Sequence, residues 1–365
     1  MQILTYKYRL KGKRAVRQLK RFAFSVNQVW NYCVQTQRLV QRNYRDGLNP
    51  KWPSHFDLGR LTVGTSKDLE VHAQTIQATC KQFTISRDQH KKCPRFRKSR
   101  DGDVKKSLGW IPFTAQNRII EGNSIIYLGN IYRWFGSKSR PLPEKVKGGS
   151  FVEDSRGRWY VTFHVEVDSL AQAPDVSIGI DLGLHTLATL SNGVKIENSR
   201  FTRKYAQQLA TAQRAGNRTR VKAIHAKIQN SRKDFLHKAS NSLASDYRQI
   251  FIGDVSSSKL ARTKMAKSVY DASWHTFKNY LCYKVSRHGG KFLEVQENFT
   301  TQTCSHCGRR PPGRPKGIAG LGIREWDCSF CGSRHDRDVN SAVNILLLGL
   351  GTQPRGDESQ TLFKR

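Results

Sequence analysis

Four cysteines near the carboxyl-terminal end are spaced for binding one metal ion. Cys304 and Cys307 form a CxxC pair, and twenty residues later Cys328 and Cys331 form a second pair. Thiolates two residues apart can reach one tetrahedral ion, and the second pair completes a closed four-thiolate site. A closed site has no position for water, so the pattern predicts one structural Zn²⁺. The alternative is a set of unrelated buried cysteines. Three nearby residues could replace a thiolate: His306, Asp327 and His335.

Acidic residues far apart in the chain form a second group that could do chemistry. Asp181 ends the apolar run SIGI, whereas Asp336 and Asp338 directly follow the cysteine region. Each has an ordinary alternative role, Asp181 in a turn and Asp336 as a helix N-cap worth about 1 kcal/mol. Together they favour metal binding. Phosphodiester hydrolysis with two Mg²⁺ ions needs convergent carboxylates, because one ion prepares a water molecule and the other stabilises the leaving oxygen.

Strands and helices must bring these carboxylates together. Residues 176–193 predict a β-hairpin, and the runs QIFIGDV and KFLEV predict two further strands. Residues 200–248 have helical periodicity with a break at Gly216–Asn217, and residues 268–287 predict one helix. The run VNSAVNILLLGLG predicts a final helix that ends at its glycines. The carboxyl-terminal half is therefore expected to be an α/β domain.

The amino-terminal half has a different pattern. The opening ILTYKYRL alternates like a strand, and from Lys13 a basic amphipathic helix follows. Another helix is expected near 68–83, and short β-like segments follow between 107 and 168. These segments predict a small β-barrel or sandwich to which the first strand returns.

The charge of the chain points to a polyanionic partner. Lys and Arg number 63 against 28 Asp and Glu, for a net charge of +35, and they occur throughout the chain. Nucleic acid is the partner that this excess favours. One basic run is expected to contact phosphates, although a solvated loop would look the same: Lys91, Lys92, Arg95, Arg97, Lys98 and Arg100. Because no apolar run is long enough for a membrane span or signal peptide, we expect a cytoplasmic, nucleoid-associated protein.

The motifs together resemble a known family. GIDLG, TTQTCSHCG and DRDVNSAVNI are similar to motifs of the TnpB proteins of bacterial insertion sequences, relatives of type V CRISPR effectors and Fanzor. The resemblance covers almost the whole chain, since CPRFRKS, GRWYVTFHVEV, DFLHKASNSLASDY and YDASWHTFKNYL occur in the family's order. It implies an RNase H-like (RuvC) domain with an inserted zinc ribbon, and an N-terminal β-barrel (wedge-like) domain interrupted by a helical recognition domain. The fold class is thus α/β plus all-β and helical parts.

The resemblance also implies domain boundaries. They are residues 1–12 and 107–170 for the β-barrel domain, 13–106 for the helical recognition domain, 175–303 and 336–350 for the RuvC domain, 304–335 for the zinc ribbon and 351–365 for a disordered tail.

By this resemblance the chain is a transposon-encoded, RNA-guided DNA endonuclease that depends on Mg²⁺. The family implies a guide RNA from the transposon end, with one protein per guide RNA, and double-stranded target DNA that is cut beside a short adjacent motif. Asp181 would be the first catalytic aspartate and Asp338 the last, with Asp336 auxiliary. A transposase that joins DNA ends itself is a further possibility, but no separate strand-transfer domain is visible.

The chain departs from the family at one catalytic position. The family usually ends its middle strand with Glu-Asp, and the Glu is the third metal ligand, but here Gly253 occupies that place. Three explanations remain open. The ligand has moved to Glu297, which lies just before the cysteine region, or Asp254 serves instead, although strand alternation turns it to the opposite face. Otherwise cleavage is lost, and the protein is a nuclease-deficient RNA-guided DNA-binding repressor. Glu294 is a weaker candidate that is expected to face solvent or pair with a lysine.

Overall fold

The computed structural model describes residues 2–98, 107–116, 119–136, 141–255, 260, 262–263, 265–316 and 319–352. The chain folds as two compact units, Met1–Asp168 and Ser169–Arg365. Arg100 and residues 353–365 of the expected tail lie outside the described residues. None of the helices in the described ranges combines the length and the apolar character that a membrane span requires.

Two antiparallel sheets form the β part of the first unit. The four-stranded sheet has the order β1-β7-β6-β2 and the three-stranded sheet the order β3-β4-β5. The opening strand pairs with β7, so its expected return to the β region is confirmed. A bridge between Leu10 and Trp134 links the two sheets, whereas the closure of a barrel stays a prediction. The strands are β1 (Gln2–Arg9), β2 (Trp110–Thr114), β3 (Ile119–Glu121), β4 (Ser124–Tyr127), β5 (Asn130–Arg133), β6 (Val146–Glu153) and β7 (Trp159–Val167).

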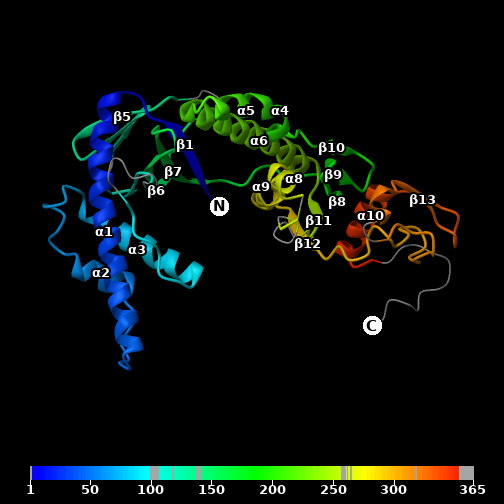
Figure 1. Cartoon of the computed structure of the whole chain (residues 1–365), viewed down its shortest axis with the longest axis horizontal. Coiled ribbons are helices and arrows are strands. Elements are labelled where there is room, and N and C mark those ends of the chain that lie inside the picture. The colour runs from blue at the N-terminus through cyan, green and yellow to red at the C-terminus, as the bar shows by residue number, and fades with distance from the viewer. Residues whose placement is uncertain are drawn as a thin grey trace. The chain divides into compact units, whose positions relative to one another are not determined.

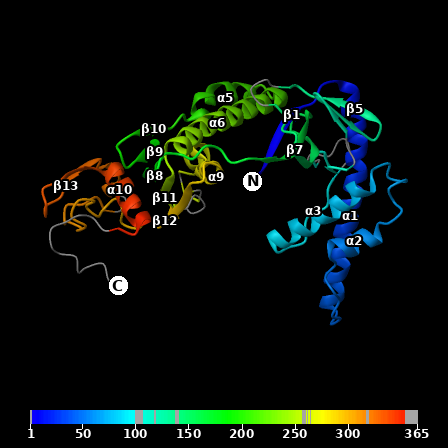
Figure 2. The same cartoon turned by 180° about the vertical axis from the view of Figure 1, so that it is seen from behind.

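The described part of the first unit also contains three helices. They are α1 (Lys13–Arg45), α2 (His55–Leu61) and α3 (Ala73–His90). Helix α3 packs against both α1 and α2, as Figure 2 shows, and it also contacts β2. Apolar residues three or four apart on α1 are buried, because they face α3 and the sheet: Leu19, Phe22, Val26, Val29, Trp30 and Cys33. The helix predicted to begin at Lys13 is therefore confirmed.

A mixed sheet of five strands organises the second unit, in the order β10-β9-β8-β11-β12. Strands β8, β9 and β10 are antiparallel neighbours, and β11 is parallel to both β8 and β12. The predicted β-hairpin and the two later strands are thus confirmed. The strands are β8 (Ser177–Leu182), β9 (Thr186–Leu190), β10 (Lys195–Glu197), β11 (Gln249–Gly253) and β12 (Lys291–Val295). The carboxyl ends of the three parallel strands meet at one edge of the sheet.

Helices cover both faces of this sheet. They are α4 (Phe201–Lys204), α5 (Ala206–Arg214), α6 (Arg218–Asp246), α8 (Ala266–Ala272), α9 (Trp274–Arg287) and α10 (Arg337–Leu350). Ile178, Ile180 and Ile252 point to the face that shares a core with α6 and α9. Helix α10, red in Figure 1, lies beside β8 on the other face. It comes so close that a Cβ on Gly179 would lie 2.1 Å from the Ala342 carbonyl oxygen, so only glycine fits there.

The helix predicted over 268–287 is two helices. Ser273 separates α8 from α9 and has a left-handed backbone with φ 53°, which ends one helix and begins the other. The Ser273 hydroxyl donates a 2.8 Å hydrogen bond to the Tyr270 carbonyl oxygen and so compensates part of the interruption. Apolar periodicity continues across the break, since Val269, Phe277 and Leu281 are all buried. The prediction of a single helix was wrong because periodicity does not detect one left-handed residue.

Candidate functional site

Asp181 lies on the α10 face of the sheet, at the carboxyl end of β8. Side chains alternate along a strand, so Asp181 points to the same face as Gly179, and Ile180 and Leu182 point into the opposite core. The Ser341 hydroxyl on α10 donates a 2.9 Å hydrogen bond to Asp181 Oδ1. The close approach of α10 to β8 therefore brings this carboxylate to the beginning of the last helix.

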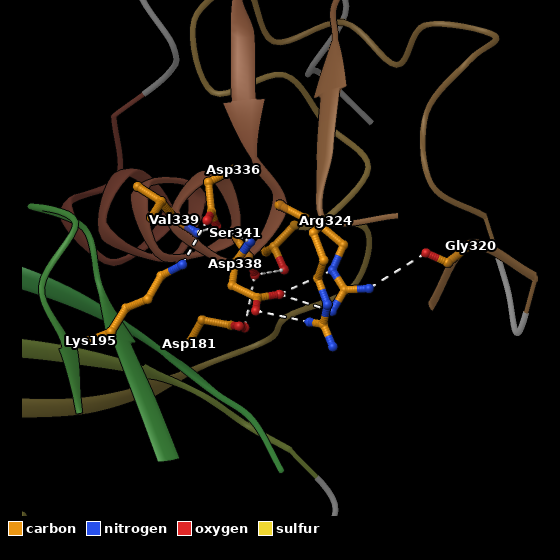
Figure 3. A network of polar contacts seen from close by, with 10 residues as sticks. Asp181, Lys195, Gly320, Arg324, Asp336, Asp338, Val339 and Ser341 are labelled. Atoms are coloured by element: carbon orange, nitrogen blue, oxygen red, sulfur yellow. Dashed lines mark hydrogen bonds and ion pairs between the residues drawn. The ribbon is translucent and has the colours of Figure 1, made fainter. Parts of the chain in front are cut away.

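The two aspartates at the start of α10 have different roles. Asp336 caps the helix, since its Oδ1 accepts hydrogen bonds from the backbone N–H groups of Asp338 (2.9 Å) and Val339 (3.0 Å). Its other oxygen forms a 2.7 Å ion pair with Lys195 Nζ. Figure 3 shows the Asp336 side chain held by these contacts, while Asp338 extends toward Asp181. The capping role proposed for Asp336 is thus observed, whereas the carboxylate of Asp338 does not cap the helix.

Two arginines contact the carboxylate of Asp338, and Figure 3 labels one of them, Arg324. Arg337 donates from Nε at 3.0 Å and from Nη2 at 2.9 Å to Oδ1, and Arg324 Nη1 lies 3.2 Å from Oδ2. Arg324 comes from the segment between the two cysteine pairs, so that segment reaches the carboxylates directly. The guanidinium groups supply positive charge to a carboxylate that is half-buried among other acids.

Glu297 occupies the space above Gly253. A Cβ added to Gly253 would lie 2.5 Å from Glu297 Oε2 and 3.4 Å from Ile345 Cδ1 of α10. Gly253 pairs with Val295 on the neighbouring strand, and Glu297 lies two residues beyond that partner. A side chain at position 253 would therefore compete with the Glu297 carboxylate for this space. Glu297 thus presents its carboxylate where a residue at 253 would have carried one.

Asp254 supports the loop that carries Glu297. Its Oδ1 accepts a 3.3 Å hydrogen bond from the Glu297 backbone N–H, and its own N–H donates to the Val295 carbonyl oxygen at 2.9 Å. The side chain of Asp254 is exposed, and the residue does not line the pocket described next. This geometry favours Glu297 over Asp254 as the third acidic residue. Glu294 forms a 2.7 Å ion pair with Lys278 Nζ, so its predicted pairing with a lysine is confirmed.

Asp181, Glu297 and Asp338 line one pocket of about 950 Å³ in the second unit. Its wall also carries five basic residues: Arg200, Arg203, Lys267, Arg324 and Arg337. A cavity lined by both carboxylates and cationic side chains suits a phosphodiester held beside metal ions. The three carboxylates lie farther apart than the ligands of a single tetrahedral ion do. Among the described residues, only the four cysteines have ligand atoms that all lie within 4.8 Å of one another.

Burial and mutual repulsion disfavour ionisation of these acids. Burial raises the pKa of Asp181 to about 8, and the neighbouring Asp338 and Glu297 carboxylates raise it as well, while the hydrogen bond from Ser341 opposes the shift. Burial, followed by the charge of Asp254, raises the pKa of Glu297 to about 6. Such shifts are expected where a cation would relieve the repulsion.

The raised pKa of Asp181 predicts how stability depends on pH. Its folded-state pKa of about 8 lies above the ordinary value of 3.8, so its contribution to folding is present at low pH and is lost as pH rises through 8. The metal-free wild type should therefore lose stability between about pH 4 and 8 relative to Asp181→Asn, and Mg²⁺ should restore it. Thermal unfolding across this range, with and without Mg²⁺, tests this. Parallel curves for the two proteins would contradict it.

The four cysteines form the expected cluster, with all four Sγ atoms within 4.8 Å of one another. The Sγ atoms of Cys304 and Cys331 lie 3.6 Å apart, and those of Cys307 and Cys328 lie 3.7 Å apart. A tetrahedron with Zn–S bonds of about 2.3 Å has edges of about 3.8 Å, so the thiolates fit Zn²⁺. His306, Asp327 and His335 are not part of this group.

The two CxxC pairs have matching backbones. Gly308 N–H donates to the Cys304 carbonyl oxygen and Gly332 N–H to that of Cys328, each at 2.8 Å. Both glycines have positive φ, 73° and 71°, which turns the chain around the sulfurs. A short 3-10 helix η1 (Ala319–Gly322) precedes the hairpin β13 (Glu325–Asp327) and β14 (Arg334–Asp336), which leads directly into α10.

The basic run after α3 divides into two kinds of residue. Lys91, Lys92, Arg95 and Lys98 are exposed. Arg97 instead points inward: its Nε donates to Asn27 Oδ1 and its Nη2 to the Leu108 carbonyl oxygen, both at 2.6 Å. Arg97 therefore connects this segment to α1 and to the chain before β2. These inward hydrogen bonds give no support to the predicted contact of Arg97 with a phosphate.

Sequence patterns missed four residues that contact the acidic residues or their backbone: Thr300, Arg324, Arg337 and Ser341. A signal for Ser341 was present, because it lies three residues after Asp338 and therefore on the same side of the helix. Asn340, Ser341 and Asn344 interrupt the apolar helix at buried positions, which indicates polar partners. Thr300 and Arg324 come from irregular segments, where spacing carries no such information.

Comparisons with known proteins agree with this architecture. Residues 160–264 match a family described as "Probable transposase", and residues 274–345 match the Cas12f1-like TNB domain. A Streptomyces pristinaespiralis protein, named a candidate RNA-guided DNA endonuclease, is 31% identical over 88% of this chain and 81% of its own length. Escherichia coli (strain K12) InsQ, named in the same way, is 24% identical over 99% of this chain and 96% of its own.

A solved structure shares the fold. The Cas12f1 chain in a cryo-EM structure of the Cas12f1-sgRNA-target DNA complex superposes with a TM-score of 0.58 at 11% identity, covering 92% of this chain and 83% of that chain. The full-length similarity to relatives, together with the motifs around Asp181, the cysteines and Asp338, establishes the assignment. The chain belongs to the TnpB family.

Proposed function

We propose that this protein is a transposon-encoded, RNA-guided DNA endonuclease that cleaves target DNA beside a short adjacent motif. The observation that carries the proposal is the meeting of Asp181, Glu297 and Asp338 in one pocket, although they are distant in sequence. Relatives along almost the whole chain are named for this activity. The mixed sheet β10-β9-β8-β11-β12, with α10 on one face, supports an RNase H-like (RuvC) domain.

The chemistry of the pocket fits Mg²⁺. Carboxylate oxygens are the ligands that Mg²⁺ prefers, and burial together with neighbouring carboxylates raises the pKa values of Asp181 and Glu297. We infer that Asp181, Glu297 and Asp338 hold two Mg²⁺ ions, which when bound prepare a water molecule and stabilise the leaving oxygen. The arginines of the pocket wall would orient the phosphate, and Ser341 orients Asp181.

The division of the chain into two units after Asp168 supports the proposed boundary between the N-terminal domains and the RuvC domain. Residues 1–12 and 107–170 would form the wedge-like domain, 13–106 the recognition domain, and 175–303 with 336–350 the RuvC domain around the zinc ribbon 304–335. The exposed Lys91, Lys92, Arg95 and Lys98 would contact nucleic acid. Sequence selection would come from pairing with a guide RNA transcribed from the transposon end, one protein per guide RNA.

A cleavage assay tests the proposal. The full chain is co-expressed with its transposon-end RNA, purified, and incubated with matching linear double-stranded DNA and Mg²⁺. We expect guide-dependent cleavage that stops in EDTA and falls by about 1,000-fold or more in Asp181→Ala, while guided DNA binding is kept. Tight guided binding by the wild type without cleavage would contradict the nuclease and support the repressor. Cleavage that persists in Asp181→Ala would exclude this pocket.

A further inference from the structure

A chain of buried hydroxyl groups connects Asp181 to the loop that carries Glu297. Ser341 Oγ lies 2.9 Å from Asp181 Oδ1 and 2.9 Å from Thr300 Oγ1. Thr300 Oγ1 also lies 2.9 Å from the Glu297 carbonyl oxygen, and the Thr300 backbone N–H donates to the same oxygen at 3.2 Å. Ser341 is 0% exposed and Thr300 is 3% exposed, so water does not compete for these groups.

Two asparagines on α10 hold the same loop. The side-chain amides of Asn340 and Asn344 each donate to the carbonyl oxygens of Thr300 and Thr303, at distances between 2.7 and 3.1 Å. Asn340 Oδ1 accepts from the Ser305 backbone N–H at 2.9 Å, inside the first CxxC pair. The loop from Glu297 to Cys304 is thus attached to one face of α10, next to Asp338.

Counting protons gives the direction of these hydrogen bonds when Asp181 is a ligand. An ionised carboxylate only accepts, so the Ser341 hydroxyl must donate to Asp181, and the single Thr300 hydroxyl proton is then shared between Ser341 Oγ and the Glu297 carbonyl oxygen, each 2.9 Å away. The Thr300 hydroxyl therefore helps to orient the Ser341 hydroxyl, and the Thr300 backbone N–H donates to the Glu297 carbonyl oxygen. Thr300 thereby contacts both Ser341, which hydrogen bonds to Asp181, and the backbone of Glu297.

We propose that Thr300 and Ser341 are positioning residues, whose hydroxyls set Asp181 and Glu297 at the separation that divalent cations require. This inference rests on the proposed function. Hydrogen-bond partners of metal ligands typically change metal affinity or activity by about 10- to 100-fold when removed. Neither residue touches substrate in this account, so the effect should appear in the Mg²⁺ dependence and not in guided DNA binding.

A matched pair of variants separates the hydroxyl from packing. Thr300→Val keeps the shape and removes the hydroxyl, whereas Thr300→Ser keeps the hydroxyl and removes a methyl group. We expect Thr300→Val and Ser341→Ala to raise the Mg²⁺ concentration for half-maximal cleavage by about 10- to 100-fold, and Thr300→Ser to stay within about threefold of wild type. The double variant Thr300→Val/Ser341→Ala should be little worse than either single variant, because the two act as a unit.

A second measurement does not depend on cleavage. Mn²⁺ binding to the RNA-free full chain, followed by electron paramagnetic resonance, should weaken in Thr300→Val and Ser341→Ala and be retained in Thr300→Ser. Equal losses in Thr300→Val and Thr300→Ser would overturn the role of the hydroxyl, as would wild-type Mn²⁺ and Mg²⁺ dependence in Thr300→Val. Asp181→Ala, assayed in parallel, distinguishes the two hypotheses. Continued cleavage by Asp181→Ala would contradict the proposed nuclease function. Loss of cleavage in Asp181→Ala together with wild-type Mg²⁺ dependence in Thr300→Val would contradict only the positioning role of Thr300.

Discussion

Glu297→Gln is expected to reduce target cleavage by about 1,000-fold or more, while guided DNA binding stays within about threefold of wild type. The amide removes a charge from the pocket without changing the shape of the side chain, so the loss reports on metal binding. Single-turnover cleavage at saturating Mg²⁺ and filter binding measure the two quantities. Two variants serve as controls. Glu294→Gln breaks only the ion pair with Lys278, and Asp254→Asn keeps an oxygen that can accept from the Glu297 N–H.

Moving the carboxylate from position 297 to position 253 tests why residue 253 is a glycine. Gly253→Glu alone should reduce cleavage, because its Cβ would lie 2.5 Å from Glu297 Oε2 and the two side chains would compete for one space. The double variant Gly253→Glu/Glu297→Ala should recover cleavage to at least about tenfold above Glu297→Ala, because it returns a carboxylate to the same space. Full activity in Glu297→Gln together with inactivity in Asp254→Asn would move the ligand to Asp254 and refute this assignment.

Removing a ligand from the proposed Zn²⁺ site is the second change with a large expected effect. Cys304→Ser or Cys328→Ser should abolish stoichiometric zinc and unfold residues 304–335, since structural zinc contributes roughly 10–16 kcal/mol of apparent binding free energy in zinc-finger peptides. Cleavage should fall as well, by at least about tenfold, because Arg324 and the Ser305 contact to Asn340 belong to this region. Elemental analysis and hydrogen exchange of residues 304–335 measure the two structural effects.

The chain contains its own control for the zinc experiment. Cys282 is an exposed free cysteine on α9, outside the cluster, so Cys282→Ser should keep one zinc per chain and wild-type cleavage. Retention of one tightly bound zinc in Cys304→Ser would show that another residue completes the site. His335 is the neighbour to examine then, since its Nε2 lies 3.0 Å from Cys304 Sγ.

Much of the fold was predictable because its signals are local. An apolar run with a tight glycine-flanked turn identified β8 and β9, the break at Gly216–Asn217 separated α5 from α6, and the CxxC spacing identified the thiolate cluster. The return of β1 to β7 was also expected. The division at Ser273 was not, because one residue with positive φ leaves the apolar pattern around it intact.

The site was predictable in its charged residues and not in its geometry. Asp181 and Asp338 stood out because carboxylates at a strand end and a helix start are poorly explained by a core. The reason for Gly253 could be seen only in three dimensions, since it depends on a side chain 44 positions later. Arg97 shows the converse, because its sequence context indicates a phosphate contact while its guanidinium lies among Asn27, Trp30 and Trp110.

The most direct test of the shared pocket is a crystal structure of the full chain with Mn²⁺, in which anomalous scattering locates the ions. We expect anomalous peaks within coordination distance of the carboxylates of Asp181, Glu297 and Asp338, with Arg324 displaced from Asp338. Peaks that include Asp254 and omit Glu297, or no peak near Asp181 and Asp338 at millimolar Mn²⁺, would contradict the account.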